Sequence, residues 1–235
     1  LYEIKPTIDI SADKEYAFRY SCRNGHLDVA KLLYQIKPTI DISANNEFAF
    51  RNSCQEGHLD VAKWLYQIKP TIDISADDEF AFRWSCVDGH LDVVKWLYEI
   101  KPTIDTSIDE IFTFSCRNGH LDIAKWLYEI KPTIDISIND EDAFGFSCKN
   151  GHLDVAMWLY EIKPTIDISI NDEFAFRYSC LEGNLDVVKW LYEIKPTIDI
   201  SINDEFAFRF SCREGNLDVA KWLLKIKPTI DVSAD

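Results

Sequence analysis

The stretch "GHLDVAKWLYQIKPTIDIS", residues Gly57–Ser75, decides the fold of this chain, because close copies of it return along the whole length. A near-identical stretch begins at Gly119. Such a period is typical of stacked supersecondary units that bury their apolar faces against their neighbours. The cysteines mark the period, 32 residues apart except for one interval of 30: Cys22, Cys54, Cys86, Cys116, Cys148, Cys180 and Cys212.

The composition excludes several classes of protein. Of the 235 residues, 47% are hydrophobic and 28% charged, which is not a disordered composition. A net charge of −15 argues against binding to nucleic acid or to an anionic membrane surface. No apolar run approaches the about 20 residues that span a bilayer, and no secretory leader is recognisable. The sequence opens and closes inside the pattern without polar capping repeats, so we expect either an excerpt of a longer chain or ends that associate.

Each unit contains two helical patterns. The first ends at Gly25, which suits the left-handed residue that closes a helix. The second spans Leu27–Ile36, with Asp28 in its first turn, and Pro38 ends it. Each pattern has one face at helical spacing, formed by Phe18, Ser21 and Cys22 in the first helix and by Val29, Leu32, Leu33 and Ile36 in the second.

The segments "NGHLDVAKLL" (24–33) and "NGHLDIAKWL" (118–127) resemble the ankyrin repeat. This resemblance implies an all-α solenoid of stacked helix–turn–helix units with short connecting turns. The family's T-P-L-H opening is replaced by "YAFR", so its Thr–His hydrogen bonds cannot form. The phrases "AFRYSC" and "KWLYEIKPTIDIS" are similar to repeats encoded by giant amoebal DNA viruses of the mimivirus type. We predict one domain over 1–235, with a partial repeat at 1–10 and full repeats at 11–42, 43–74, 75–106, 107–136, 137–168, 169–200 and 201–235.

The seven cysteines and five histidines invite a metal or disulfide hypothesis. A Cys and a His four residues apart give two ligands, whereas a closed zinc site needs four. Helices pack about 8–10 Å apart, and disulfide-bonded Cα atoms must lie within about 7 Å. We therefore predict no metal, no cofactor and no disulfide, and buried small thiols instead. Free cysteines suit a reducing compartment, the cytosol or the nucleus, with a host cell as one alternative.

The histidines of the interhelical turn are replaced by Asn184 and Asn216 in the last two units. Asparagine shares the hydrogen-bonding role of neutral histidine but cannot act as a base. The replacement predicts a turn-stabilising role, and no unique catalytic constellation stands out among the repeated polar residues. The chain is therefore predicted not to be an enzyme. The histidines concerned are His26, His58, His90, His120 and His152.

Two further repeated features are predicted to be structural. A glutamate precedes an arginine by four residues at the start of the first helix, an order that forms ion pairs on a helix. A tryptophan replaces Leu32 in the later units, where we expect core packing rather than a ligand cage. The pairs are Glu15/Arg19, Glu47/Arg51, Glu79/Arg83, Glu173/Arg177 and Glu205/Arg209, and the tryptophans are Trp64, Trp96, Trp126, Trp158, Trp190 and Trp222.

The copies differ mainly at the end of the first helix, on the side opposite its packing stripe. Stacked side by side, these positions are predicted to line one concave groove of aromatic and mixed charged residues, a composition enriched at protein interfaces. The surface would centre on Trp84, Phe114 and Phe146; drift on a solvated face is the alternative. The candidate partner-binding residues are Tyr20, Arg23, Asn24, Asn52, Gln55, Trp84, Val87, Phe114, Arg117, Phe146, Lys149, Tyr178, Leu181, Phe210 and Arg213.

One region breaks the period. The interval of 30 places a two-residue deletion between Thr106 and Phe112, and the next unit carries Asp142 and Gly145 where others have an aromatic and an arginine. Glycine costs a helix about 1 kcal/mol relative to alanine. We predict a bend or a weak interface between repeats over 106–146.

The resemblance implies a non-catalytic module that binds a protein partner, and the acidic surface favours a partner with a basic patch. A structural spacer or scaffold, with an inert groove, is one alternative. Another is the targeting arm of a larger protein whose effector segment, such as a ubiquitin-ligase-recruiting motif, lies outside these residues.

Overall fold

The structure is a computed structural model that describes residues 11–104 and 108–230. Over this part of the chain every regular element is a helix, so the predicted all-α solenoid class is confirmed. The first helices of the hairpins are α1 (Ala12–Arg23), α3 (Ala44–Gln55), α5 (Ala76–Val87), α7 (Ile108–Arg117), α9 (Ile138–Lys149), α11 (Ile170–Glu182) and α13 (Ile202–Arg213). The second helices are α2 (Leu27–Ile36), α4 (Leu59–Ile68), α6 (Leu91–Ile100), α8 (Leu121–Ile130), α10 (Leu153–Ile162), α12 (Leu185–Ile194) and α14 (Leu217–Ile226).

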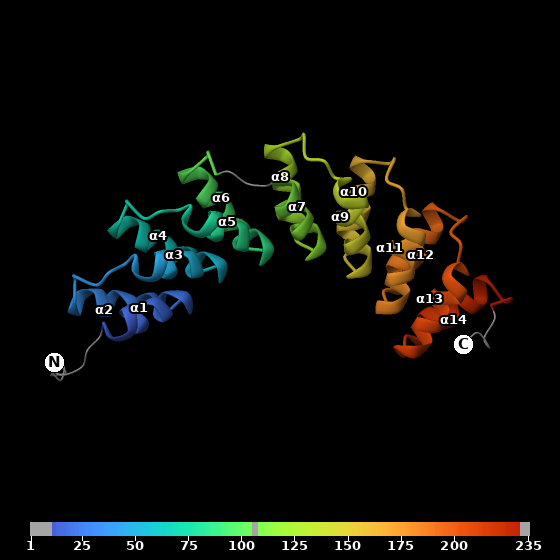
Figure 1. Ribbon diagram of the computed structural model, residues 1–235, viewed down its shortest axis with the longest axis horizontal. Helices are drawn as coiled ribbons and strands as arrows, with labels where there is room; N and C mark the ends of the chain where they lie inside the picture. Colours follow the sequence, from blue (N-terminus) through green and yellow to red (C-terminus); the bar gives the residue numbers. More distant parts are fainter. Residues whose placement is uncertain (1–10, 105–107, 231–235) are drawn as a thin grey trace. The chain divides into compact units, whose positions relative to one another are not determined.

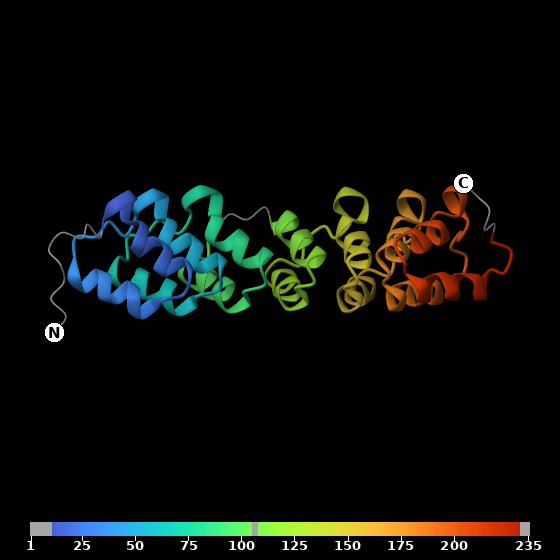
Figure 2. The ribbon, with the colours of Figure 1, turned by 90° about the horizontal axis from the view of Figure 1, so that it is seen from below.

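The chain divides into two compact units, Leu1–Thr106 and Ser107–Asp235. In unit 1, α3 packs between α1 and α5; in unit 2, α7, α9, α11 and α13 pack in chain order. Each first helix also packs on the second helix of its own hairpin, and Figures 1 and 2 show successive hairpins side by side within each unit. The division falls at the deletion, where the sequence predicts a weak interface, although residues 105–107 themselves lie outside the described part.

A left-handed glycine ends the first helix of each hairpin, as predicted. Gly25 has φ +74°, and its N–H donates to the carbonyl of Cys22. The next N–H, of His26, donates to the carbonyl of Ser21 at 2.8 Å. These two bonds form a Schellman motif, which satisfies the last carbonyls of the helix and turns the chain into α2.

The core consists of small and aromatic residues of the first helices against a stripe on the second helices. Phe50, Val61 and Leu65 are fully buried. The tryptophans tie neighbouring repeats together, which confirms their packing role: Trp64 lies 6.2 Å from Phe18 and 5.9 Å from Tyr34 between ring centres, both in the preceding hairpin. The equivalent ring pairs are Phe50–Trp96, Phe112–Trp158 and Phe144–Trp190.

The apolar face predicted for the first of these second helices is only partly buried. In α2, Val29, Leu32 and Ile36 are 46%, 53% and 38% exposed. The corresponding Val61 is fully buried, because α4 has the α1–α2 hairpin before it. No hairpin precedes α1–α2 in the part of the chain that the structure describes.

The predicted Glu/Arg ion pairs along the first helix are wrong, because the start of this helix is not right-handed. Asp13, Lys14 and Glu15 all have positive φ, and the N–H of Glu15 donates to the carbonyl of Ser11. The glutamate is therefore not one right-handed turn before Arg19. The arginine instead donates to the carbonyls of Lys14 (2.7 Å) and Asp13 (2.9 Å). The same left-handed turn opens α3, α5, α11 and α13.

The glutamate of this turn binds neighbouring loops instead. In the third hairpin Ser75 Oγ donates to Glu79 Oε1 at 2.6 Å, and Lys101 Nζ lies 3.1 Å from the same oxygen. Glu15 and Glu205 lie near Lys37 and Lys227 in the same way. This Ser–Glu–Lys group joins the two ends of a hairpin.

A column of serine hydroxyls links successive first helices inside each unit. Ser85 Oγ donates to the carbonyl of Cys54, and Ser179 Oγ to that of Cys148, both at 2.9 Å. Both serines are fully buried. Because their partners are carbonyls of the preceding repeat, these bonds fix the register between hairpins.

Candidate functional site

Aromatic rings form a row across the first helices of unit 1. Tyr16 stacks on Tyr20 at 4.3 Å between ring centres, and Tyr20 lies 5.3 Å from Phe48 of the next hairpin. Phe80 and Trp84 form the next pair at 5.8 Å. The two aromatics of a repeat are four residues apart, so they share one face of the helix.

Unit 2 carries a row of its own, in which the ring contacts run without a break across three hairpins. Phe146 lies 5.4 Å from Phe174, which lies 4.5 Å from Tyr178 in the same helix. Tyr178 lies 5.6 Å from Phe206, and Phe206 stacks on Phe210 at 4.1 Å. We use the name ring row for each of the two sets: these five residues in unit 2, and Tyr16, Tyr20, Phe48, Phe80 and Trp84 in unit 1.

Arginines of the first helices lie over the same rings. The guanidinium carbon of Arg51 lies 4.7 Å from the centre of the Phe80 ring, and that of Arg177 lies 4.8 Å from the centre of Phe206. Each arginine belongs to the repeat before its aromatic partner. Cation–π contact thus adds to ring contact between neighbouring repeats.

The aromatic residues predicted from the sequence lie on the first helices, and the exposed fractions of their side chains differ. Trp84 and Phe114 are 43% and 41% exposed, whereas Tyr20, Phe146, Tyr178 and Phe210 are half-buried. Trp84 belongs to unit 1 and Phe114 and Phe146 to unit 2, so the predicted centre is divided between the two.

One predicted contact residue is not on the surface. Asn52 is only 8% exposed, and its side-chain amide donates to the carbonyl of Phe48 at 2.9 Å. It occupies the place of Tyr20 or Trp84 in its repeat. The ring row of unit 1 therefore has one ring in its second repeat and two in each of the others.

The charged candidates lie at the end of the first helix and contact the rings or an acidic residue of the next hairpin. Arg117 lies over Phe146 with its guanidinium carbon 4.6 Å from the ring centre. Lys149 Nζ lies 5.1 Å from the centre of Tyr178. Arg23 forms an exposed 3.1 Å ion pair with Glu56 of the next hairpin. The remaining predicted positions, Asn24, Gln55, Val87, Leu181 and Arg213, are all half-buried or exposed.

Comparison between copies missed half of the ring row. This position holds Tyr16, Phe48, Phe80, Phe174 and Phe206 in five repeats and an acidic residue, Glu110 or Asp142, in the other two. Its aromatic copies are nearly all phenylalanine, so a comparison directed at the most variable positions passes over them. Their spacing of four residues from the variable aromatic was the available signal, since such residues share a helix face.

The turn histidines and their asparagine replacements contact the preceding repeat. Asn184 and Asn216 donate to the carbonyls of Lys149 and Leu181, each at 2.7 Å. The ring of His152 lies against Gly119 of the preceding repeat. Burial is the main cause that lowers the pKa of His152 below its ordinary value of 6.5, with a smaller opposing effect of Asp154. None of these side chains caps its own helix. The hydrogen bonds of Asn184 and Asn216 lie between repeats, so packing between hairpins takes the place of the turn-stabilising role expected from the sequence.

The thiols lie in the core. Six of the seven cysteines are buried and Cys212 is exposed. Burial raises the pKa of Cys22 to about 12 and raises those of the other five buried thiols too. Such thiols carry almost no reactive thiolate at neutral pH.

Residues 11–104 and 108–230 contain neither a candidate metal site nor a membrane-spanning helix. There is no group of three or more histidine, cysteine, aspartate or glutamate residues placed to hold a metal ion. No helix in these ranges combines the length and the apolar character needed to cross a bilayer.

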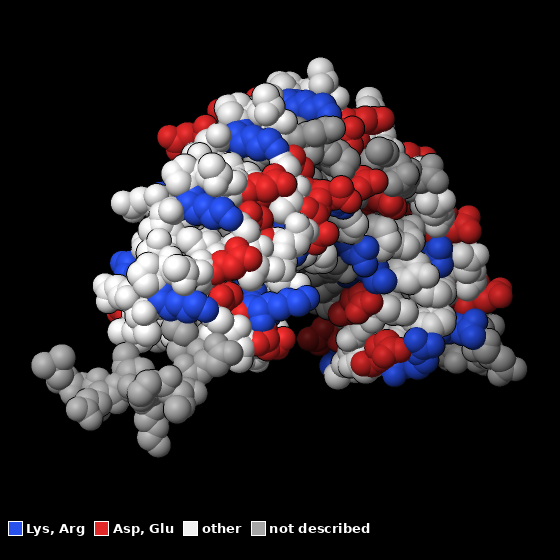
Figure 3. Space-filling model, turned by 60° about the vertical axis from the view of Figure 1, so that its left-hand side comes forward, with Lys and Arg blue, Asp and Glu red and all other residues white. Residues whose placement is uncertain are grey.

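Acidic and basic side chains are intermixed on the surface. Figure 3 shows lysines and arginines separated by aspartates and glutamates, without an uninterrupted basic field on that face.

A family model described as "Ankyrin repeats (3 copies)" matches the sequence in overlapping segments, residues 53–142, 82–172, 112–205 and 144–234. Together the segments cover more than half of the chain. No match was found among curated proteins.

Proposed function

Because the chain belongs to the ankyrin-repeat family, whose repeats are in general protein–protein interaction modules, we propose that it is a non-catalytic module that binds a protein partner over the ring row. The observation that carries this proposal is the row itself. Rings from successive first helices contact one another and remain partly exposed, with Trp84 43% exposed. Aromatic residues are enriched at interface hot spots.

The row suits binding because it is held in place before a partner arrives. Arg51 and Arg177, each from the preceding repeat, lie over the rings of Phe80 and Phe206 and hold them in position. Side chains that are already ordered lose little conformational entropy on association, which favours affinity.

The partner is proposed to present a basic patch. The chain has 40 acidic and 25 basic residues. Complementary charge would speed association and select the partner, while the rings would supply most of the binding energy. We propose a reducing compartment, cytosol or nucleus, for this interaction, and the likeness to giant-virus repeats favours a host protein as the partner.

The experiment is affinity capture from a cell lysate with the chain and two ring variants, Trp84→Ala in unit 1 and Tyr178→Ala in unit 2. We expect the proteins retained specifically by the wild type to be lost from at least one variant, with thermal stability changed by only a few degrees. Met157→Lys is the matched control, because Met157 is 48% exposed on a second helix and its sister repeats carry lysine there.

Capture that is insensitive to both ring variants would favour the second candidate, a spacer or scaffold with an inert face. The repetition of near-identical hairpins favours that candidate, since stacked repeats are suited to spanning distance. The role of a targeting arm in a larger protein is tested by the full-length open reading frame, which would encode an effector segment beside these repeats.

A further inference from the structure

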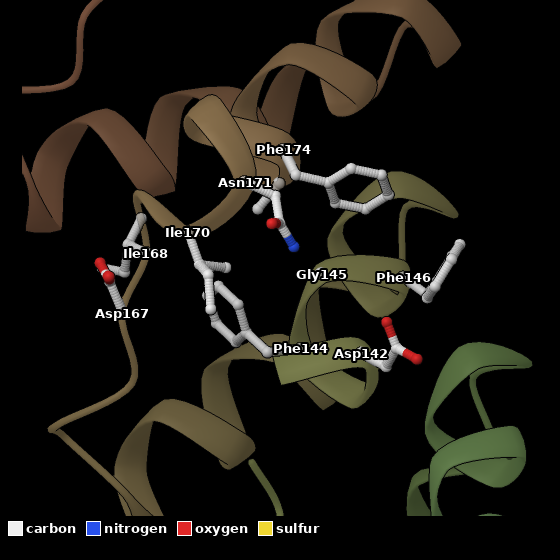
Figure 4. Close-up of a pocket in the computed structure, with 10 residues that line it drawn as sticks. Asp142, Phe144, Gly145, Phe146, Asp167, Ile168, Ile170, Asn171 and Phe174 are labelled. Atoms are coloured by element: carbon white, nitrogen blue, oxygen red, sulfur yellow. The ribbon is translucent and has the colours of Figure 1, made fainter. Parts of the chain in front are cut away.

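A pocket of about 60 Å³ lies between α9 and α11 in unit 2, at the position where Gly145 interrupts the repeated pattern. Apolar side chains form one wall, and the side chains of Asn171 and Phe174 reach from α11 toward the stretch of α9 that holds Gly145 (Figure 4). Asp142 and Asp167 also line it, and the Asp167 carboxylate accepts a hydrogen bond from the N–H of Ser169 at 3.0 Å.

Three sister repeats show what normally fills this position. Arg19, Arg51 and Arg177 correspond to Gly145, and each places its guanidinium over the phenylalanine of the next repeat at 4.7–4.8 Å. The aromatic residue at that place beside Gly145 is Phe174. A glycine thus leaves the ring face without the cation that covers it elsewhere.

In one sister repeat the guanidinium also has a polar partner at the place that Asn171 holds beside the pocket. Arg51 forms an ion pair with the carboxylate of Asp77, at the start of the next first helix. Asn171 occupies the same place relative to Gly145 and lines the pocket. Its amide oxygen can accept a hydrogen bond from a guanidinium, as the carboxylate of Asp77 does.

We propose that this pocket binds an arginine side chain of the partner protein. This inference rests on the proposed function, since it specifies one group of the partner. The guanidinium would lie flat on Phe174, as Arg177 lies on Phe206, and would donate to Asn171. The nearby carboxylates select a cation, and the planar ring face selects a guanidinium over an ammonium. The arginine that the other repeats provide within the chain is here provided by another molecule.

The variant Gly145→Arg tests this directly, because it restores the arginine of the sister repeats and fills the pocket from within. A Cβ on Gly145 would lie 3.1 Å from the Phe174 ring, so the ring has to move by a few tenths of an ångström. Sister repeats hold arginine and phenylalanine together at these places, so we expect the variant to fold, with a raised melting temperature. Met157→Lys is the control, since it adds the same charge to an exposed site of the same hairpin.

The probe is N-acetyl-L-arginine amide, titrated into the chain while the backbone amide of Gly145 and the side-chain amide of Asn171 are followed by NMR. We expect saturable shifts at both groups in the wild type and in Met157→Lys, and affinity at least tenfold weaker in Gly145→Arg. The lysine and citrulline analogues test the guanidinium and its charge, and both should bind at least several-fold more weakly.

Equal binding of the arginine and citrulline analogues, equal binding of the lysine analogue, or unchanged binding in Gly145→Arg would each overturn the proposal. Partner capture separates this proposal from the broader one. If ring variants lose the partner while Gly145→Arg retains it with unchanged affinity, the ring row stands and the arginine pocket fails. If no ring variant affects capture, the proposed function itself fails.

Discussion

Arg177 and Phe206 belong to neighbouring repeats, and the guanidinium carbon of the one lies 4.8 Å from the ring centre of the other. The same arginine donates from Nη2 to the carbonyl of Asn171 at 3.1 Å, inside the left-handed turn that opens its own helix. One side chain therefore stabilises the left-handed turn of its own helix and contacts an aromatic ring of the next repeat.

Replacing this arginine should destabilise unit 2. In Arg177→Met the apolar stem is kept, but the partly buried turn carbonyls and the Phe206 ring lose their cation. Hydrogen bonds from charged groups contribute about 1.5–3 kcal/mol each, and Arg177 makes two, so we expect a loss of about 3 kcal/mol in urea unfolding. Lys189→Met, at the lysine of the second helix in the same repeat, is the control. Equal effects of the two substitutions would contradict the role given to Arg177.

Replacing a buried aromatic residue of the core should cost much more stability than replacing an exposed residue of the ring row. Phe82 is fully buried, whereas Trp84 is 43% exposed two residues later in the same helix. Burial makes Phe→Ala cost about 3–5 kcal/mol in a core, while Trp84→Ala should cost about 1 kcal/mol. Thermal and urea unfolding of the two variants measure this. Similar losses would show that Trp84 is part of the core.

The folded chain should lose stability as the pH decreases below about 6.5, because of His152. Burial lowers the pKa of this histidine in the folded chain below 6.5. The unfolded chain therefore binds the proton more readily, and acidification through this range favours unfolding. In His152→Asn, which reproduces the residue of the last two repeats, the drop in melting temperature between pH 7.5 and 5.5 should be smaller. An identical pH profile in the variant would rule out this contribution.

The thiols of the native chain should react in two classes. Cys212 is exposed, whereas burial raises the pKa of the other six thiols, that of Cys22 to about 12. With an aromatic disulfide reagent at pH 8 we expect one thiol to react quickly and six only as fast as the repeats open. Cys212→Ser should abolish the fast phase. A fast phase of several thiols would mean that the repeats open readily.

The weak interface between repeats that is predicted over residues 106–146 can be tested by hydrogen exchange. The two-residue deletion and Gly145 remove contacts of the regular repeat there. Amides of residues 108–146 should therefore exchange faster than those of 165–215. Uniformly slow exchange would contradict the prediction, and Gly145→Arg should slow exchange in the second half of the region.

Much of the fold could be predicted from the sequence. The repeat, the second helix at Leu27–Ile36 and the left-handed Gly25 follow from signals within a few residues, since hydrophobic spacing and glycine preference act locally. The aromatic surface was predicted in part. Variation between copies marks Tyr20 and Trp84, but not the aromatic residues that lie four positions before them, Tyr16 and Phe80.

The partners of the polar side chains could not be predicted in this way. Spacing alone paired Glu15 with Arg19, yet a left-handed turn directs the glutamate toward Lys37 and the arginine toward Phe48 of the next repeat. The burial of Asn52 and the pocket at Gly145 likewise depend on how one hairpin meets the next.

The sequence by itself thus determined the architecture, because each hairpin is specified by local patterns repeated along the chain. Only the tertiary structure decided which side chains meet between repeats, since those contacts join residues about one period apart in sequence. The pocket at Gly145 exists for that reason: the arginine missing from one repeat would have covered a ring that belongs to the next.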